Sequence, residues 1–198
     1  MIDHDLQKHA GEFKGYLDGH QYEVSDEGIM FPKAGVTVQG EYLLSSHGYV
    51  DAIEKNLVTT EGLNHLLMVA LNYTAKLNTF YLSLFSGAYT PVAGLTAATY
   101  PASATEITSG TEGYSEAVRQ TWSPAAASGG VMDSYATKAA FTIATATSLT
   151  IRGAALTSSN VKGATTGVLI SATRFSADRV QYNSDVFNLG YRVTLAAA

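Results

Sequence analysis

A strict alternation of apolar with polar or small residues near the C-terminal end is the feature that most constrains the fold. Its apolar members are Phe187, Leu189, Tyr191, Val193 and Leu195. Successive side chains of a β-strand point to opposite faces of a sheet, whereas a helix repeats its apolar positions every three or four residues. The period of two therefore predicts a half-buried antiparallel strand over residues 185–195.

Further strands are predicted along the chain, separated by turn residues and by one long loop. They cover residues 36–43, 80–85, 139–144, 148–156 and 167–175. Regularly spaced strands of this kind, most of them after a single helix, are typical of a β-sandwich. We therefore predict a mainly β fold with an antiparallel β-sandwich or jelly-roll-like body.

One amphipathic helix interrupts this β pattern. Thr59 and Thr60 are candidate N-caps, and Glu61 lies in the first turn, where the helix dipole favours an acid. The apolar stripe consists of Leu63, Leu66, Leu67, Ala70 and Leu71. Because these positions share one side of a helix, we expect the stripe, with Leu67 at its middle, to cover one face of a sheet.

Charge divides the chain into two unequal parts. Residues 1–61 hold 11 of the 17 acidic residues but only four of the 12 lysines and arginines. Residues 1–35 show no sustained apolar period and are broken by glycines, so we interpret them as irregular or extended. We predict that residues 1–55 form an extended N-terminal arm with a short strand and that residues 56–198 form the β-sandwich body.

The arm carries spaced aromatic residues that a purely solvated tail would not need. The candidate interface residues among them are Phe13, Tyr16, Tyr22 and Phe31. Such an arm either lies across the surface of another protein or packs on its own domain. The sequence leaves both interpretations open.

A second group of candidate interface residues lies between residues 112 and 122. Tyr114, Arg119 and the single tryptophan, Trp122, occur there at short spacing. These residue types are enriched at the energetic centres of protein interfaces. The alternative is structural, with Trp122 filling the sandwich interior and Arg119 paired with a carboxylate.

No motif in the sequence predicts catalysis, a metal or a cofactor. The absence of cysteine excludes disulfides, cysteine-ligated zinc and a thiol nucleophile. Neither G-x-S-x-G nor H-E-x-x-H occurs, and the acidic residues between the predicted helix and the last predicted strand all lie in predicted loops. We therefore expect no enzymatic activity, no catalytic residues, no metal and no cofactor.

Composition excludes two further classes and favours a third. A sequence pI of 5.4 argues against a nucleic-acid partner, and no apolar stretch approaches the length of a membrane span. The N-terminus also lacks the basic-then-apolar order of a signal peptide. Ala, Gly, Ser and Thr make up 85 of the 198 residues, while only 15% of residues are charged. Such compositions are common in secreted β-proteins and in shell or fibre proteins, whose surfaces face other subunits.

Taken in order, these segments resemble a group of small virion structural proteins of tailed bacteriophages, head decoration (cement) proteins among them. The resemblance covers roughly residues 56–195. It is carried by residues 56–64 at the start of the helix, 80–85, Tyr114 to Trp122, 141–143, 151–154 and the closing strand that contains Tyr191. It implies a non-enzymatic particle protein located in the virion, which assembles in the host cytoplasm. The implied partners are the major capsid protein or other virion proteins, with the chain itself a homo-oligomer, most naturally a trimer.

Three functions remain open on the sequence alone. The first is a decoration protein that stabilises the capsid by bridging neighbouring capsid subunits. The second is a collar or tail adaptor, or a fibre-attachment component, of the same kind of particle. The third is a carbohydrate-binding module that stacks exposed tyrosine and tryptophan rings on sugars.

Overall fold

The computed structural model describes residues 22–24, 30–32 and 36–197. The chain divides into two compact units, Met1–Thr37 with Leu195–Ala198, and Val38–Thr194. In the first unit, strand β1 (Tyr22–Val24) pairs antiparallel with β2 (Met30–Pro32), with Glu23 opposite Phe31. Phe13 and Tyr16 lie outside the described residues.

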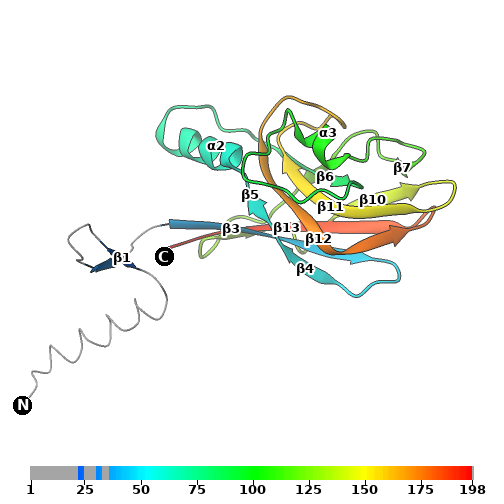
Figure 1. Ribbon diagram of the computed structural model, residues 1–198, viewed down its shortest axis with the longest axis horizontal. Coiled ribbons are helices and arrows are strands. Elements are labelled where there is room, and N and C mark those ends of the chain that lie inside the picture. Colours follow the sequence, from blue (N-terminus) through cyan, green and yellow to red (C-terminus); the bar gives the residue numbers. More distant parts are fainter. Residues whose placement is uncertain (1–21, 25–29, 33–35, 198) are drawn as a thin grey trace, which may run out of the picture. The chain divides into compact units, whose positions relative to one another are not determined.

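The second unit is built on two antiparallel sheets (Figure 1). The six-stranded sheet has the order β4-β3-β13-β10-β7, with β9 also pairing β13. Its strands are β3 (Val36–Ser46), β4 (Ala52–Lys55), β7 (Gly113–Tyr114), β9 (Val131–Asp133), β10 (Ala139–Ala144) and β13 (Val186–Ala197). The predicted mainly β, antiparallel sandwich class is confirmed.

The other sheet has five strands in the order β5-β12-β11-β6-β8. They are β5 (Leu57–Val58), β6 (Phe80–Phe85), β8 (Gln120–Trp122), β11 (Leu149–Thr157) and β12 (Leu169–Gln181). Two helices accompany the sheets, α2 (Thr60–Leu71) and the short α3 (Tyr100–Ala104). Helix α3 belongs to the stretch expected to be one long loop after β6.

The main hydrophobic core draws its side chains from both sheets. Strand β13 supplies the fully buried Phe187, Leu189 and Tyr191, which are alternate residues as predicted. The ring of Tyr191 lies 4.7 Å, centroid to centroid, from the ring of Tyr42 on β3. A second, smaller cluster gathers α3 and the loop around Leu95 against residues of β6, β11 and β12.

The predicted boundary after residue 55 is wrong. Strands β3 and β4 belong to the six-stranded sheet, and Tyr42 and Leu44 are buried in the main core. The link between β4 and β5 is tied to the same sheet, because Asn56 donates its backbone N–H to the Gly40 carbonyl at 3.1 Å. The body therefore begins near Val38, since burial of these β3 side chains makes the strand part of the sandwich.

Candidate functional site

Helix α2 is fixed to the body through its first turn. The Thr59 hydroxyl accepts the Gly62 backbone N–H at 3.0 Å, which caps the helix as the sequence predicted. Thr59 also donates its own backbone N–H to the Ile170 carbonyl on β12 at 3.0 Å. Gly62 lies so close to β12 that an added Cβ would be 2.4 Å from that same carbonyl oxygen.

Glu61 completes this attachment. One oxygen of its carboxylate accepts backbone N–H groups from Ala97, at 2.8 Å, and from Leu169, at 2.7 Å. The carboxylate therefore joins the helix, the loop before α3 and the start of β12. Hydrogen bonds to a charged group are stronger than those between neutral groups, so the first turn is held firmly.

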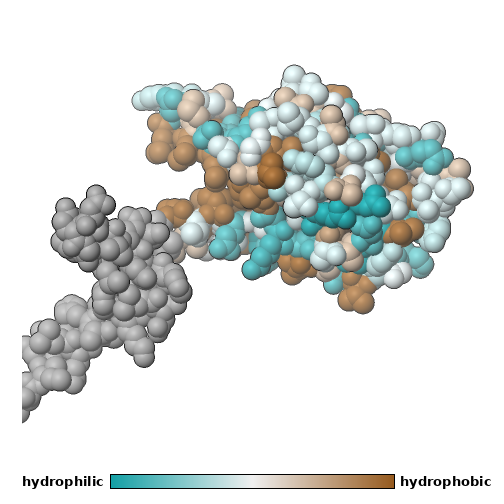
Figure 2. All heavy atoms as spheres, in the orientation of Figure 1, coloured by the Kyte–Doolittle hydropathy of each residue, from teal (hydrophilic) through white to brown (hydrophobic). Residues whose placement is uncertain are grey.

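The leucine stripe of α2 does not cover a sheet. We call Leu63, Leu66, Leu67 and Leu71 the leucine face. All four are exposed, Leu67 by 57% and Leu71 by 79% of its surface. Figure 2 shows hydrophobic residues gathered along this part of the molecule. The expectation that the stripe packs on a sheet is wrong for the described chain.

The physical reason lies on the opposite side of the helix. Gly62, His65 and Val69 are spaced i, i+3 and i+7, and together with Glu61 they are the residues of α2 that are buried or half-buried. The close approach at Gly62 and the hydrogen bonds of Glu61 set the rotation of the helix about its axis. That rotation turns the leucine face away from β12.

Further exposed apolar residues lie on the helix and just beyond it. Met68 of α2 and Leu77 are exposed, and Tyr73 is fully exposed. Residues 62–75 include no Asp, Glu, Lys or Arg. The exposed apolar area is on the order of 500 Å², which is at the upper end of what monomeric proteins leave in water. Loss of charge and enrichment in methionine and aromatic residues are typical of interface centres.

Arg119, one of the predicted interface residues, is buried. Its Nε and Nη2 each donate to a different oxygen of the buried Glu106 carboxylate at 2.7 Å. Its Nη1 donates to the Thr157 hydroxyl at 2.9 Å and to the Ser159 carbonyl at 3.1 Å. Burial acts to lower the pKa of Arg119, but the hydrogen bonds and charge of Glu106 outweigh burial and raise it.

Tyr114 is also buried, packed edge to face on Phe141 with centroids 5.0 Å apart. The Lys162 Nζ lies 3.5 Å from the Tyr114 ring centroid and donates to the Tyr114 carbonyl at 2.8 Å. Burial raises the pKa of Tyr114 well above its ordinary value and lowers the pKa of Lys162. This placement gives Tyr114 and Arg119 internal roles in place of the expected contact with a partner.

Trp122 takes the structural role that the sequence offered as an alternative. Its half-buried ring packs edge to face on Tyr191, and its Nε1 donates to the Tyr191 carbonyl at 3.1 Å. Phe13 and Tyr16 lie outside the described residues, and for Tyr22 and Phe31 only the backbone is described.

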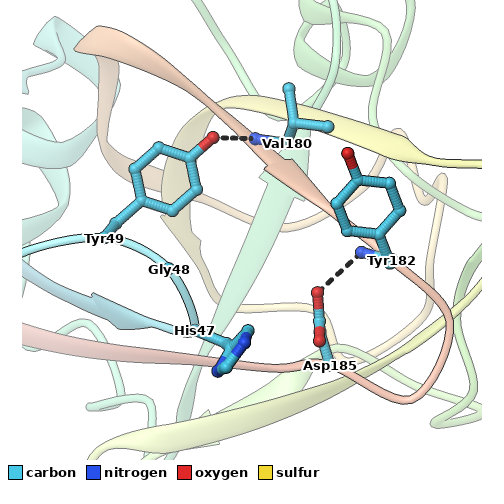
Figure 3. Close-up of a pocket in the computed structure, with 6 residues that line it drawn as sticks. All are labelled: His47, Gly48, Tyr49, Val180, Tyr182 and Asp185. Carbon is cyan, nitrogen blue, oxygen red and sulfur yellow. Dashed lines mark hydrogen bonds between the residues drawn. The ribbon is translucent and has the colours of Figure 1, made fainter.

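A small pocket of about 310 Å³ lies between the β3–β4 turn and the β12–β13 turn (Figure 3). Its lining residues are His47, Gly48, Tyr49, Val180, Tyr182 and Asp185. The Tyr49 hydroxyl accepts the Val180 backbone N–H at 3.0 Å, and the Asp185 carboxylate accepts the Tyr182 N–H at 2.7 Å. Tyr182 is exposed, and the Arg179 guanidinium carbon lies 4.8 Å from the Tyr49 ring centroid. Sequence analysis missed this pocket, because only folding brings the two turns together.

Two further properties bear on function. Within the described part of the chain, no cluster of three or more His, Asp or Glu side chains has the arrangement needed to hold a metal ion. None of the described helices combines the length and apolar character that crossing a membrane requires. Comparison of the sequence with protein-family models and with curated proteins finds no match.

Proposed function

We propose that this chain is a non-enzymatic structural protein of a tailed-bacteriophage particle, where it decorates and stabilises the capsid by bridging neighbouring capsid subunits. The observation that supports the proposal most directly is the leucine face. A helix fixed firmly to a rigid sandwich presents four exposed leucines that nothing in the described chain covers. Such a face fits a protein whose working state is an assembly.

Two other features support the same function. The resemblance of residues 56–195 to virion structural proteins of tailed phages includes the segment that opens α2. The body is also stabilised internally, because Arg119 and Tyr114 are used within the fold. A rigid body with a separate apolar contact face suits a protein that adds stability to a shell. Binding only to the assembled shell would raise its stability by mass action.

The decisive experiment compares particles with and without this protein. We expect particles that lack it to release their genome at a lower temperature, and we expect added protein to restore the heat resistance. Particles of equal heat resistance with and without it would contradict the decoration role. The number of copies per particle distinguishes decoration from a collar or tail adaptor. Hundreds of copies fit decoration, whereas a collar or tail adaptor would be present in a small ring.

A matched pair of variants ties this function to the leucine face. Leu67 on α2 and Ile53 on β4 are both 57% exposed, and neither is in the main core. Leu67→Lys should abolish the rescue of heat resistance, whereas Ile53→Lys should leave it intact. Equal rescue by both variants would show that the leucine face plays no part in the particle.

Carbohydrate binding remains a second candidate function, and the pocket between the two turns favours it. Tyr49 and Tyr182 supply aromatic rings, and Asp185 supplies a carboxylate that can accept hydrogen bonds from sugar hydroxyls. Tyr114 is fully buried and the half-buried Trp122 packs on Tyr191, so neither ring is free to stack on a sugar. Glycan binding that is lost in Tyr182→Ala but kept in Tyr73→Ala, a change to an exposed tyrosine outside the pocket, would support this candidate.

A further inference from the structure

We infer that the leucine face is covered by the leucine face of another copy of this chain, so that copies associate helix against helix through α2. The inference refines the proposed function, because it states which surface holds the copies together. The inference depends on the proposed function only for the biological purpose of the association. The self-association itself follows from the exposed residues of α2.

The first argument is chemical. From Gly62 to Ala75 the chain carries no Asp, Glu, Lys or Arg, and Glu61 is already engaged with two backbone N–H groups. Charged and polar groups are what usually select one particular foreign partner and steer it into position. The leucine face has neither to offer. A second leucine face is the partner that matches it in chemistry, and the chain supplies that surface in every copy.

The second argument is area. One leucine face together with the adjacent exposed Met68, Tyr73 and Leu77 offers on the order of 500 Å² of apolar surface, and pairing two copies removes both patches from water at once. The paired surface, about twice that area, approaches the roughly 1,200 Å² at which stable interfaces begin. Burial of the same face against a polar surface would remove only half as much apolar area.

The third argument is geometric. Leu63, Leu67 and Leu71 are four residues apart, and such rows form the ridges that pack into the grooves of a neighbouring helix. Helix α2 lies at the periphery of the body and is bonded to it mainly through its first turn (Figure 1). Two or three copies can bring the same helices together around a symmetry axis. A dimer or a trimer formed this way satisfies the inference.

The first test is the mass of the full chain in solution, measured by light scattering or sedimentation over a range of concentrations. We expect the wild-type chain to form a dimer or trimer. Leu67→Lys should raise the dissociation constant by about a hundredfold or more, because each copy would then bring a charge into an apolar contact. Ile53→Lys, at equal exposure, should leave the mass unchanged. A monomeric wild type, or a Leu67→Lys chain that remains oligomeric, would overturn the inference.

The absence of cysteine allows a second, independent test. A single cysteine introduced as Leu67→Cys should form a disulfide between copies under mild oxidation, whereas Ile53→Cys should not. Circular dichroism and unfolding curves confirm that each variant is folded. An oligomer that does not depend on Leu67 and does not cross-link there would contradict the inference and place the contact elsewhere, on the N-terminal arm or another face.

The two proposals fail in different ways. If the chain is monomeric but Leu67→Lys still loses particle rescue, the self-pairing is wrong and the particle function stands, with a capsid surface covering α2. If the leucine faces pair but the protein neither binds nor stabilises particles, the self-pairing stands and the particle function is wrong.

Discussion

Glu106→Gln probes the buried ion pair that connects the loop after α3 with the loop before β8. The Glu106 carboxylate receives two hydrogen bonds from Arg119 and a third from the Gly163 backbone N–H at 3.0 Å. Both side chains of the pair are essentially fully buried. The substitution keeps the shape of the side chain, removes its charge and leaves the arginine without a counter-charge.

The expected cost follows from that burial. Removing one partner of a buried ion pair leaves an unpaired charge in a medium that solvates it poorly, which costs about 3–5 kcal/mol. The hydrogen bonds from Arg119 to Thr157 and Ser159 remain, so the guanidinium stays in place and bears the full penalty. For a domain of this size, the melting temperature should fall by about 6–20 °C.

Urea unfolding, followed by fluorescence and circular dichroism, measures the free energy of unfolding directly. Asp178→Asn is the matched control, because Asp178 pairs with Arg152 at a similar distance of 2.9 Å while both side chains are about one-third exposed. The control should change stability by about 1 kcal/mol or less. The double variant Glu106→Gln with Arg119→Met should be markedly more stable than the sum of the two single changes predicts. A cost below about 1 kcal/mol for Glu106→Gln, or strict additivity, would refute the reasoning.

Three further outcomes are expected. Gly62→Ala should lower the free energy of unfolding by about 1–3 kcal/mol, because the new methyl group would meet the β12 backbone. The control Gly94→Ala places its methyl group in open space and should leave stability unchanged. Equal unfolding midpoints for the two variants would contradict this account of how α2 is attached. Leu67→Ala should change the unfolding free energy of the dissociated chain by less than about 1 kcal/mol, since a solvent-exposed side chain leaves no cavity, and a larger loss would mean that the leucine is buried. Burial raises the pKa of four tyrosines above the value near 10 of the unfolded chain, so their contribution to stability is complete below that pH and declines as pH rises above it. In an alkaline titration followed by ultraviolet absorbance, these tyrosines should therefore ionise only as the chain unfolds. Their ionisation in the folded chain would refute the claim that burial raises their pKa values. The four are Tyr42, Tyr100, Tyr114 and Tyr191.

The sequence predicted those elements whose apolar pattern is long enough to show a period. Strand β13 was recognised from its alternation, and the side chains of Phe187, Leu189 and Tyr191 are buried as that pattern requires. Strands of two to four residues, such as β5 and β7, are too short to display any period. Their existence depends on pairing with long strands elsewhere in the chain.

The roles of individual side chains were harder to predict than the strands. Arg119 was expected either at an interface or paired with a carboxylate, and the six acidic residues after residue 61 were available as partners. Glu106 is selected only because folding brings the loop after α3 beside the loop before β8. The pocket residues have the same origin, since His47 and Asp185 are 138 positions apart in the sequence.

The leucine face shows a different limit of sequence interpretation. Periodicity identifies an apolar side of a helix, but it does not state whether the surface that covers that side belongs to the same chain. One signal was present in the residues opposite the stripe. A helix that turns its leucines inward normally presents charged residues to solvent, and residues 62–75 carry none.

Gly62 and Glu61 explain why this arrangement is stable in a folded body. If hydrophobic burial alone set the orientation of α2, the leucines would rotate onto β12 and the side that carries Gly62, His65 and Val69 would face water. The contact of Gly62 with the Ile170 backbone and the two hydrogen bonds of Glu61 oppose that rotation. The body therefore fixes the helix in the orientation that keeps its leucines available, and the apolar burial that α2 forgoes within one chain is the driving force that the proposed pairing of copies would use.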